Sequence, residues 1–539
     1  MSADVLAPKA KSKGAKSGGG TAAQPGKAPK LLIAVCLLIG AASHGWNMFR
    51  YPLYLTDEGI YMEQAWSVLK EGRLSPYTYF YDHAPMGWLA LAGWVGVLPG
   101  GFGAFGNAIN TGRVLMLIVH LASVFLMFEV VRRFTGSKSA AFLAVFVFNL
   151  SPLGVYYQRQ VLLDNLMMFW ILFGLYLLAR KDRRIVTAMG AGACFGVALV
   201  TKENAVFLLP GCAYLLHKSI REQPNRRFGV SFWWFSVLVP VAAYLLFAQI
   251  KNELFPEGFR FNPDNNQLQG HVSLLNTIWW QLHRNSNSST GLSFTYLLQQ
   301  SWLFKDRYLL IAGAAATVLA LISGRRNKRL RTPMLACAIM ALGYGFYLSR
   351  SALLDFYIAP MVPLFALNLG MFFGWLTRRT NQGGAAVLVA CLLVPVLVMP
   401  GGFMVKYNAK GELEFSDAYR LPLTRLQEQQ VAWIKHNVPT SARLIIDDDI
   451  WVALHDSKPA YRYAHPHYKA TSDPDVRDKV FHSSWENVDY VVMSNKMRDA
   501  LQRGGETWII EAIDQHGETV WQATRGDVSL SIVKIGNSS

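Results

Sequence analysis

The sequence predicts an α-helical polytopic membrane protein of about 11 spanning helices that ends in a small soluble α/β domain. Hydrophobic residues make up 52% of the 539 residues and the mean hydropathy is +0.21, which is too apolar for a soluble chain of this length. Apolar segments long enough to cross a bilayer recur through residues 31–404. Residues 405–539 contain none and have the composition of a soluble domain.

Residues 1–30 are rich in Lys, Gly, Ala and Pro and predict a disordered basic cytoplasmic tail, because they cannot build a core. The first apolar segment is interpreted as a membrane anchor, since the tail before it is long and no convincing signal-peptide cleavage site follows. The predicted spans cover residues 31–50, 109–131, 138–155, 162–179, 185–201, 204–217, 230–250, 308–323, 333–348, 355–376 and 384–404.

The loop charges predict the orientation in the membrane, because short cytoplasmic loops are enriched in Lys and Arg. With the N-terminus inside, every predicted inside loop is basic, as at Arg132-Arg133, Arg180-Lys181 and Arg325-Arg326. The net charge of +17 is therefore attributed to topology rather than to nucleic-acid binding. The same alternation places residues 405–539 on the extracytoplasmic side of a plasma or inner membrane.

The first outside loop, residues 51–108, starts with two adjacent acids. Thr56 is predicted to cap a helix that carries Asp57 and Glu58 in its first turn and ends at Gly72. An apolar stripe on this helix predicts that it lies on the membrane surface, and residues 85–98 predict a second interfacial helix. An alternative is that the two acids only complement the helix dipole.

The topology gathers further polar residues at the same membrane face, each at the end of a predicted helix where an ionised group can reach water. Singly they have ordinary explanations, such as snorkelling of the cations and helix capping by the acids. Jointly they suit an anionic lipid head group held beside a carboxylate base. These residues are Tyr81, Asp82, His83, Arg159, Asp164, Lys202, Glu203, Arg350, Asp355 and Tyr357.

Two further regions are predicted to lie outside the membrane on the same side. Residues 251–307 predict either an acceptor-binding or lid segment or, as the favoured interpretation, a lipid-surface helix anchored by Trp279 and Trp280. After residue 405, a helix is predicted at 425–437 and strands at 443–447, 488–493, 507–513 and 528–535. The acids Asp447, Asp448 and Asp449 raise a metal or sugar-site hypothesis, which is weak because adjacent side chains point in different directions.

The cysteines predict no disulfide framework and no thiolate metal site. All five fall within predicted spans, and the outside regions, where oxidation would be possible, contain none.

Two sequence runs in the first outside loop resemble the GT-C glycosyltransferases, specifically the protein-mannosyltransferase and aminoarabinose-transferase superfamily. The resemblance extends over roughly residues 31–404. It is carried by Asp57-Glu58-Gly-Ile-Tyr-Met-Glu-Gln-Ala, by Tyr77-Thr-Tyr-Phe-Tyr-Asp82-His83-Ala-Pro85-Met-Gly, by Arg113, Asp164-Asn165 and Thr201-Lys202-Glu203, and by Phe356-Tyr357-Ile-Ala-Pro360-Met-Val-Pro363.

The resemblance implies a polyprenyl-phosphate-linked sugar as donor and transfer with inversion at the anomeric carbon. It implies Asp57 as the catalytic base, with Glu58 and Asp164 as further candidates, the latter either assisting the base or orienting Arg159. Lys202 and Arg350, with Arg159 and Tyr357, would contact the donor phosphate. Candidate substrate contacts are Tyr81, Asp82, His83, Glu203 and Asp355.

The chain departs from the superfamily pattern in two places. His83-Ala84-Pro85 stands where many relatives have two prolines, which leaves the role of His83 open. The first loop has no Asp-any-Asp metal pattern, so we expect a metal-independent reaction in which protein cations replace the ion, with a divalent cation as the alternative.

The sequence is compatible with four functions. The leading one is a membrane glycosyltransferase acting on a lipid, cell-wall glycan or protein acceptor. A polytopic transporter or lipid-linked sugar flippase is the main alternative, although transporters place ionisable groups near the membrane midplane and often have repeated halves. A non-catalytic scaffold and a ligase that uses a polyprenyl diphosphate oligosaccharide are the other two.

Overall fold

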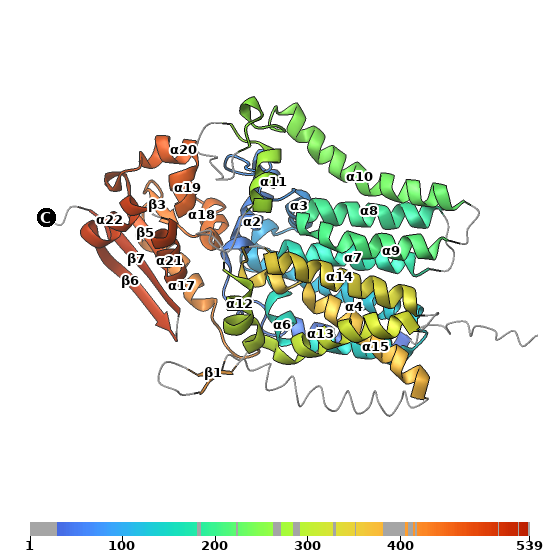
Figure 1. The fold of residues 1–539 in the computed structure, drawn as a ribbon. Helices are drawn as coiled ribbons and strands as arrows, with labels where there is room; N and C mark the ends of the chain where they lie inside the picture. The colour runs from blue at the N-terminus through green and yellow to red at the C-terminus, as the bar shows by residue number, and fades with distance from the viewer. Residues whose placement is uncertain are drawn as a thin grey trace, which may run out of the picture.

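The computed structural model consists of a bundle of long helices with a smaller α/β domain at one of its ends (Figure 1). It describes residues 30–180, 185–221, 225–261, 271–283, 292–326, 330–350, 352–380, 405–407, 413–415, 418–504, 506–526 and 528–536. The predicted span at 384–404 and Cys391 lie outside these ranges. The other four cysteines are buried in the bundle.

Ten of the predicted spans coincide with helices of the bundle. Five helices or continuous helical segments are long and apolar enough to cross a membrane, from Ala108 to Thr135, Arg226 to Ile250, Phe294 to Arg325, Arg331 to Arg350 and Asp355 to Thr377. The total of 11 spans is not confirmed by these lengths. The helices are α1 (Lys30–Gly45), α4 (Ala108–Thr135), α5 (Lys138–Leu150), α6 (Pro152–Tyr157), α7 (Leu163–Leu178), α8 (Ile185–Thr201), α9 (Leu209–Ser219), α10 (Arg226–Ile250), α13 (Leu303–Arg326), α14 (Arg331–Arg350) and α15 (Met361–Thr380).

The two ends of the bundle differ in charge. The start of α7 and the end of α8 meet beside the α/β domain, because Asp164 and Lys202 form an ion pair there. The opposite ends of α7 and α8 therefore lie away from the domain, as does the end of α4. These ends, together with the start of α5, carry Arg133, Lys138 and Arg180. This arrangement agrees with the loop charges, while the side of the membrane on which each end lies stays a prediction.

Helices α2 (Thr56–Glu71) and α3 (Met86–Gly96) lie between the bundle and the α/β domain (Figure 1). Gly72 ends α2 with a φ of 67°, as predicted. The prediction that Thr56 caps α2 is wrong, because its hydroxyl instead donates to Asp447 across the domain boundary at 3.0 Å. Helix α2 is also more enclosed than a surface helix, since Glu63 and Ser67 are buried along with its apolar residues.

The α/β domain has a five-stranded mixed sheet with the order β4-β3-β5-β7-β6. Strand β3 runs parallel to β4 and β5, and β7 is antiparallel to β5 and β6. The strands are β3 (Leu444–Ile446), β4 (Ala464–Pro466), β5 (Tyr490–Ser494), β6 (Gly517–Arg525) and β7 (Val528–Ile535), preceded by a pair formed by β1 (Val405–Tyr407) and β2 (Leu413–Phe415).

The helices of this domain confirm one prediction and correct another. Helix α17 (Arg425–Asn437) spans the predicted residues. The strand predicted at 507–513 is wrong, because these residues belong to α22 (Thr507–His516), where Ile509 and Ala512 are buried at helical spacing. The remaining helices are α18 (Trp451–His455), α19 (His467–Ser472), α20 (Pro474–Val476) and α21 (Asn495–Gly504).

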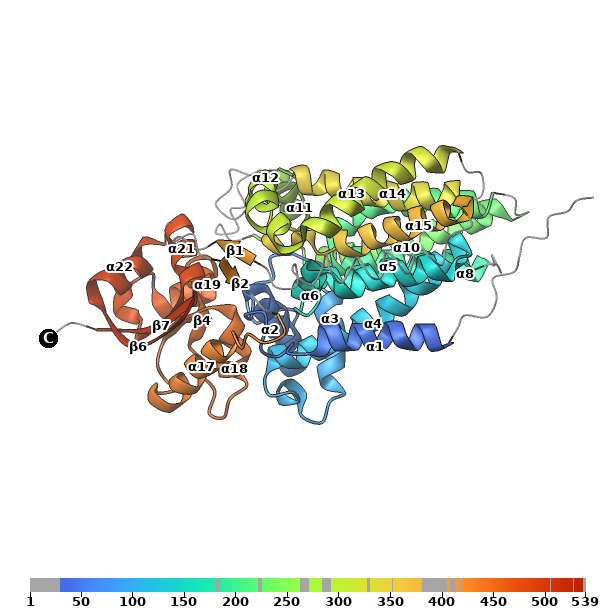
Figure 2. The ribbon, with the colours of Figure 1, turned by 90° about the horizontal axis from the view of Figure 1, so that it is seen from below.

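The second outside loop contributes two short helices near the domain boundary, α11 (Leu274–His283) and α12 (Phe294–Leu297), seen from below in Figure 2. Trp279 on α11 is 40% exposed and stacks on His283. An exposed aromatic residue on a short apolar helix agrees with the predicted lipid-surface helix.

Candidate active site

Helix α2 is held in place by a buried ion pair at its first turn. Arg113 from α4 donates Nε to Glu58 Oε1 at 2.9 Å and a terminal nitrogen to Oε2 at 2.7 Å. Neither side chain is exposed to solvent. The same guanidinium donates to the carbonyl oxygens of Met48, Pro52 and Leu53, which ties the chain before α2 to the bundle.

Glu58 has no acceptor capacity left for a substrate. A carboxylate offers about four lone-pair positions. Two accept from Arg113, and the amide nitrogens of Val161 and Leu55 donate to Oε1 and Oε2 at 2.9 and 3.1 Å. We therefore infer that Glu58 positions α2 rather than acting as a base.

The α/β domain holds the other side of α2 by a close backbone contact. A Cβ atom at Gly59 would lie 2.2 Å from the backbone carbonyl of Asp448, which only a glycine avoids. With the Thr56 to Asp447 hydrogen bond, this contact holds the first turn of α2 between the bundle and the α/β domain. Asp57 therefore has a fixed position.

Asp57 is half-buried in an electrostatically mixed environment. Burial raises its pKa from an ordinary value near 4 to about 6, against the opposing effects of Lys202 and His83 and with a smaller upward contribution from Asp164. Its neighbour Tyr61, one helical turn later, directs its hydroxyl to Asp57 Oδ1 at 3.5 Å. Asp57 is thus ionised at neutral pH and able to accept a proton near pH 6.

The main cation of the site is Lys202, which is buried at the end of α8. Its ammonium pairs with Asp164 at the start of α7, and lies 4.8 and 5.0 Å from the ring centroids of Tyr357 and Phe356. Asp164 Oδ1 is buried without a hydrogen-bond partner. An ammonium has three donors, so its pairing with Asp164 leaves capacity for a further anion.

His83 forms a second pair at the edge of the site. Its Nδ1 lies 3.0 Å from Glu203 Oε2, and Glu203 also accepts from the amide nitrogen of Ala84. The Tyr79 hydroxyl donates to the His83 carbonyl at 2.5 Å. These contacts hold His83, the residue that departs from the superfamily pattern. Its imidazole therefore has a defined orientation next to Tyr61.

The predicted residues thus form one central cluster, Asp57, His83, Asp164, Lys202, Glu203 and Tyr357, which we term the Asp57 cluster. Others have separate contacts. Arg159 donates to the carbonyls of Ser43 and Ala418, Asp355 pairs with Lys305, Tyr81 donates to Glu253, Asp82 is exposed, and the exposed Arg350 lies over the Phe346 ring.

Sequence reasoning missed two features of α2. Tyr61 is absent from the predicted site residues, although its spacing of four residues from Asp57 places both on one helix face. Glu63, on another face, lies against the α/β domain. Burial raises the pKa of Glu63 to about 8, against the effect of Lys469. Burial, and after it the charge of Glu63, raises the pKa of Asp448. No local signal in the sequence indicates that contact.

Metal ligation finds no support in this part of the molecule. Within the described residues, no group of three or more His, Cys, Asp or Glu side chains is arranged to hold a metal ion. Asp447, Asp448 and Asp449 do follow a strand as predicted, but they contact Thr56, Tyr468 and Gln427 respectively.

Comparison with solved structures identifies the fold. The crystal structure of ArnT from Cupriavidus metallidurans bound to undecaprenyl phosphate matches 94% of this chain and 98% of its own, with a TM-score of 0.57 and 16% identity. The chain has the GT-C fold. The predicted fold class is confirmed, and the resemblance to GT-C proteins holds for the fold. The apolar helices agree with an integral membrane protein.

Two further GT-C structures agree. Archaeal oligosaccharyltransferase AglB from Archaeoglobus fulgidus, in complex with an inhibitory peptide and a dolichol-phosphate, matches 90% of this chain and 72% of its own, with a TM-score of 0.54 and 11% identity. The oligosaccharyltransferase of the same organism tethered to an acceptor peptide matches 94% and 74%, with a TM-score of 0.53 and 11% identity.

Sequence comparison adds a family match to part of the chain. Residues 82–247 match the family model described as dolichyl-phosphate-mannose-protein mannosyltransferase. This segment includes His83, Asp164, Lys202 and Glu203 of the Asp57 cluster. No curated protein sequence matches the chain.

Proposed function

We propose that the chain is a membrane glycosyltransferase that moves a sugar from a polyprenyl-phosphate donor to an acceptor hydroxyl. The observation that carries the proposal is Asp57, a half-buried carboxylate with a pKa of about 6, held rigidly near the buried ammonium of Lys202 in a GT-C fold. A base and a cation beside one another are what the displacement of a phosphate by a hydroxyl requires.

The proposed step is a single displacement at the anomeric carbon with inversion. The acceptor oxygen forms a bond to that carbon while the bond from the carbon to the phosphate oxygen breaks, and its electron pair leaves with the polyprenyl phosphate. Asp57 takes the proton of the acceptor hydroxyl. The leaving phosphate gains one negative charge, which the Lys202 ammonium stabilises, with His83 of the Asp57 cluster as an additional donor.

Within this proposal the reaction takes place at the extracytoplasmic face, where the basic-loop rule places the α/β domain. The acceptor is a lipid, a cell-wall glycan or a protein that bears a hydroxyl group. The protein cations supply the charge that a metal ion would otherwise provide. Tyr61 and Asp164 are proposed to orient the base and the ammonium.

The test compares cells with and without the chain, followed by reconstitution. Mass spectrometry of polyprenyl-phosphate sugars and surface glycans should reveal one accumulated lipid-linked sugar and one lost decoration in cells that lack it. The purified chain in lipid nanodiscs should then release polyprenyl phosphate from that lipid as the sugar joins the acceptor. A flippase would leave donor and acceptor chemically unchanged, and that result would contradict the proposal.

The base assignment makes a prediction about pH. We expect kcat/KM for transfer to rise with pH through a single acid limb near pH 6, because Asp57 must be ionised to accept a proton. Lys202 is the charge that lowers this pKa most, so Lys202→Gln should move the limb upward by about one unit as well as weaken donor binding.

The control is Asp164→Asn, which removes a charge that raises the pKa of Asp57, and so should move the acid limb in the opposite direction. Rates are measured with the donor lipid identified above from pH 5 to pH 9. Acid limbs that coincide in all three proteins would show that Asp57 does not set the profile.

A further inference from the structure

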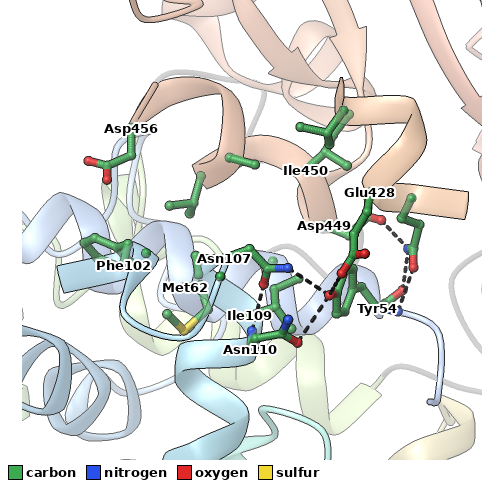
Figure 3. Close-up of a pocket in the computed structure, with 18 of the residues that line it drawn as sticks. Tyr54, Met62, Phe102, Asn107, Ile109, Asn110, Glu428, Asp449, Ile450 and Asp456 are labelled. Atoms are coloured by element: carbon green, nitrogen blue, oxygen red, sulfur yellow. Dashed lines mark hydrogen bonds between the residues drawn. The ribbon is translucent and has the colours of Figure 1, made fainter. Parts of the chain in front are cut away.

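A cavity of about 500 Å³ lies between the first outside loop and the α/β domain (Figure 3). One wall comes from Tyr54, from α2 and from the residues that lead into α4. The other comes from α17, from the turn after β3 and from α18. The volume is within the range of sites that bind small molecules.

This cavity is separate from the Asp57 cluster. Gly59 and Met62 of α2 line it, and they lie about 200° and 140° around the helix from Asp57. Neither His83 nor Lys202 is among its lining residues. Helix α2 therefore presents the carboxylate on one face and the cavity wall on the opposite face.

The lining combines acceptors with apolar walls. Its side chains include four acids and one base, and burial raises the pKa of Asp448 and Asp449 well above the ordinary value. Three amides lie among apolar side chains that include one phenyl ring, as in sites that orient a ligand with a few polar groups. The acids are Glu428, Asp448, Asp449 and Asp456, the base is Lys435, and the amides are Asn107, Asn110 and Gln427.

A hydrogen-bond hub at one end of the cavity has spare acceptor capacity. The Tyr54 hydroxyl accepts from Asn107 Nδ2 at 2.8 Å, and both Asn110 Oδ1 at 3.2 Å and Glu428 Oε1 at 3.1 Å lie within reach of its hydrogen (Figure 3). A phenol has one hydrogen, so it serves only one of these oxygens at a time. The other can accept from the hydroxyl of a ligand.

We propose that this cavity binds a neutral, hydroxyl-rich saccharide. Sugar hydroxyls supply the donors that its acids and amides need, and the apolar face of a sugar ring suits Phe102 and Met62. If the chain is a glycosyltransferase as proposed above, the saccharide is an acceptor segment remote from the reacting hydroxyl. The identity of the ligand as acceptor rests on that function, whereas saccharide binding does not.

Charge and shape distinguish this ligand from two others. A lipid phosphate would find one base, Lys435, among four carboxyl groups, so the cavity lacks the cations that a phosphate needs. A basic peptide would satisfy the acids but would place ammonium groups against Met62, Phe102 and Ile109. The apolar walls therefore favour the neutral sugar.

The experiment is saturation-transfer NMR on the full chain in lipid nanodiscs, without sugar-based detergent. The ligands are tetrasaccharides of mannose, glucose and N-acetylglucosamine, with tetragalacturonate as the anionic comparison and tetralysine as the cationic peptide. At least one neutral tetrasaccharide should bind. Val431→Trp on α17 and Ala453→Trp on α18, which fill the cavity from different elements, should each weaken that binding by at least about tenfold.

Ala432→Trp is the matched control, because Ala432 is exposed on α17 and does not line the cavity. It should retain the intact affinity. Absence of binding by all neutral saccharides, binding that survives both filling variants, or tighter binding of tetragalacturonate or tetralysine would each overturn the proposal. Asp57→Asn should bind the saccharide normally. An intact chain that binds the saccharide but has no transferase activity would contradict only the proposed function.

Discussion

Asp57→Asn is expected to lower kcat/KM for sugar transfer by roughly 10²–10⁴-fold, the usual contribution of a general base. Asn has almost the shape of Asp but cannot accept a proton at neutral pH. Donor affinity should change little, because the phosphate is assigned to Lys202. The measurement is the initial rate of polyprenyl phosphate release by the purified chain, together with the dissociation constant of the donor.

The folding of this variant separates a catalytic role from a structural one. Burial raises the pKa of Asp57 in the folded chain, so its ionised form opposes folding at neutral pH, and this cost declines as pH falls from about 6 to about 4. The neutral Asn avoids the cost, and Tm should be no lower than that of the intact chain. Glu71→Gln, at the exposed end of α2, is the matched control and should keep full activity. Turnover by Asp57→Asn within about threefold of normal would make Asp164 the better candidate for the base.

The gathering of Asp57, Asp164 and Lys202 could be predicted because it depends only on chain direction. Each stands at the end of an apolar segment, and alternating spans bring such ends to one face of the bundle. The same argument placed Arg159 and Arg350 at that face without defining where their side chains point. Arg159 donates its hydrogen bonds to backbone carbonyls, and Arg350 is exposed. Both orientations depend on side-chain packing, which the topology does not specify.

The parts that could not be predicted are contacts between distant segments. The cavity joins Tyr54 to Glu428, which are separated by 374 residues. The backbone contact of Gly59 with Asp448 likewise requires the α/β domain to be in place. In that domain, the apolar run at 507–513 fits a strand and a helix equally well by composition, so its helical state was decided by burial of Ile509 and Ala512 against the sheet.

Glu58→Gln is expected to destabilise the fold by about 3–5 kcal/mol, because it leaves the buried Arg113 guanidinium without its counter-charge. The measurement is the unfolding free energy of the purified chain in mixed micelles, supported by Tm. Activity should fall because less of the chain is folded, while the fraction that is folded keeps the pH profile set by Asp57. Substitution of Asp57 is thus expected to affect the chemical step, whereas substitution of the neighbouring Glu58 is expected to affect folding.

The double variant Glu58→Leu with Arg113→Met tests that explanation. Removing both charges together avoids an uncompensated ion, and replacing a buried pair by apolar residues often costs little. Stability should therefore recover most of what Glu58→Gln loses, although the hydrogen bonds from Arg113 to Met48 and Pro52 remain absent. Equal destabilisation in the single and double variants would mean that those backbone bonds, rather than the ion pair, hold the start of α2. A single variant as stable as the intact chain, with activity lost, would instead return Glu58 to the catalytic candidates.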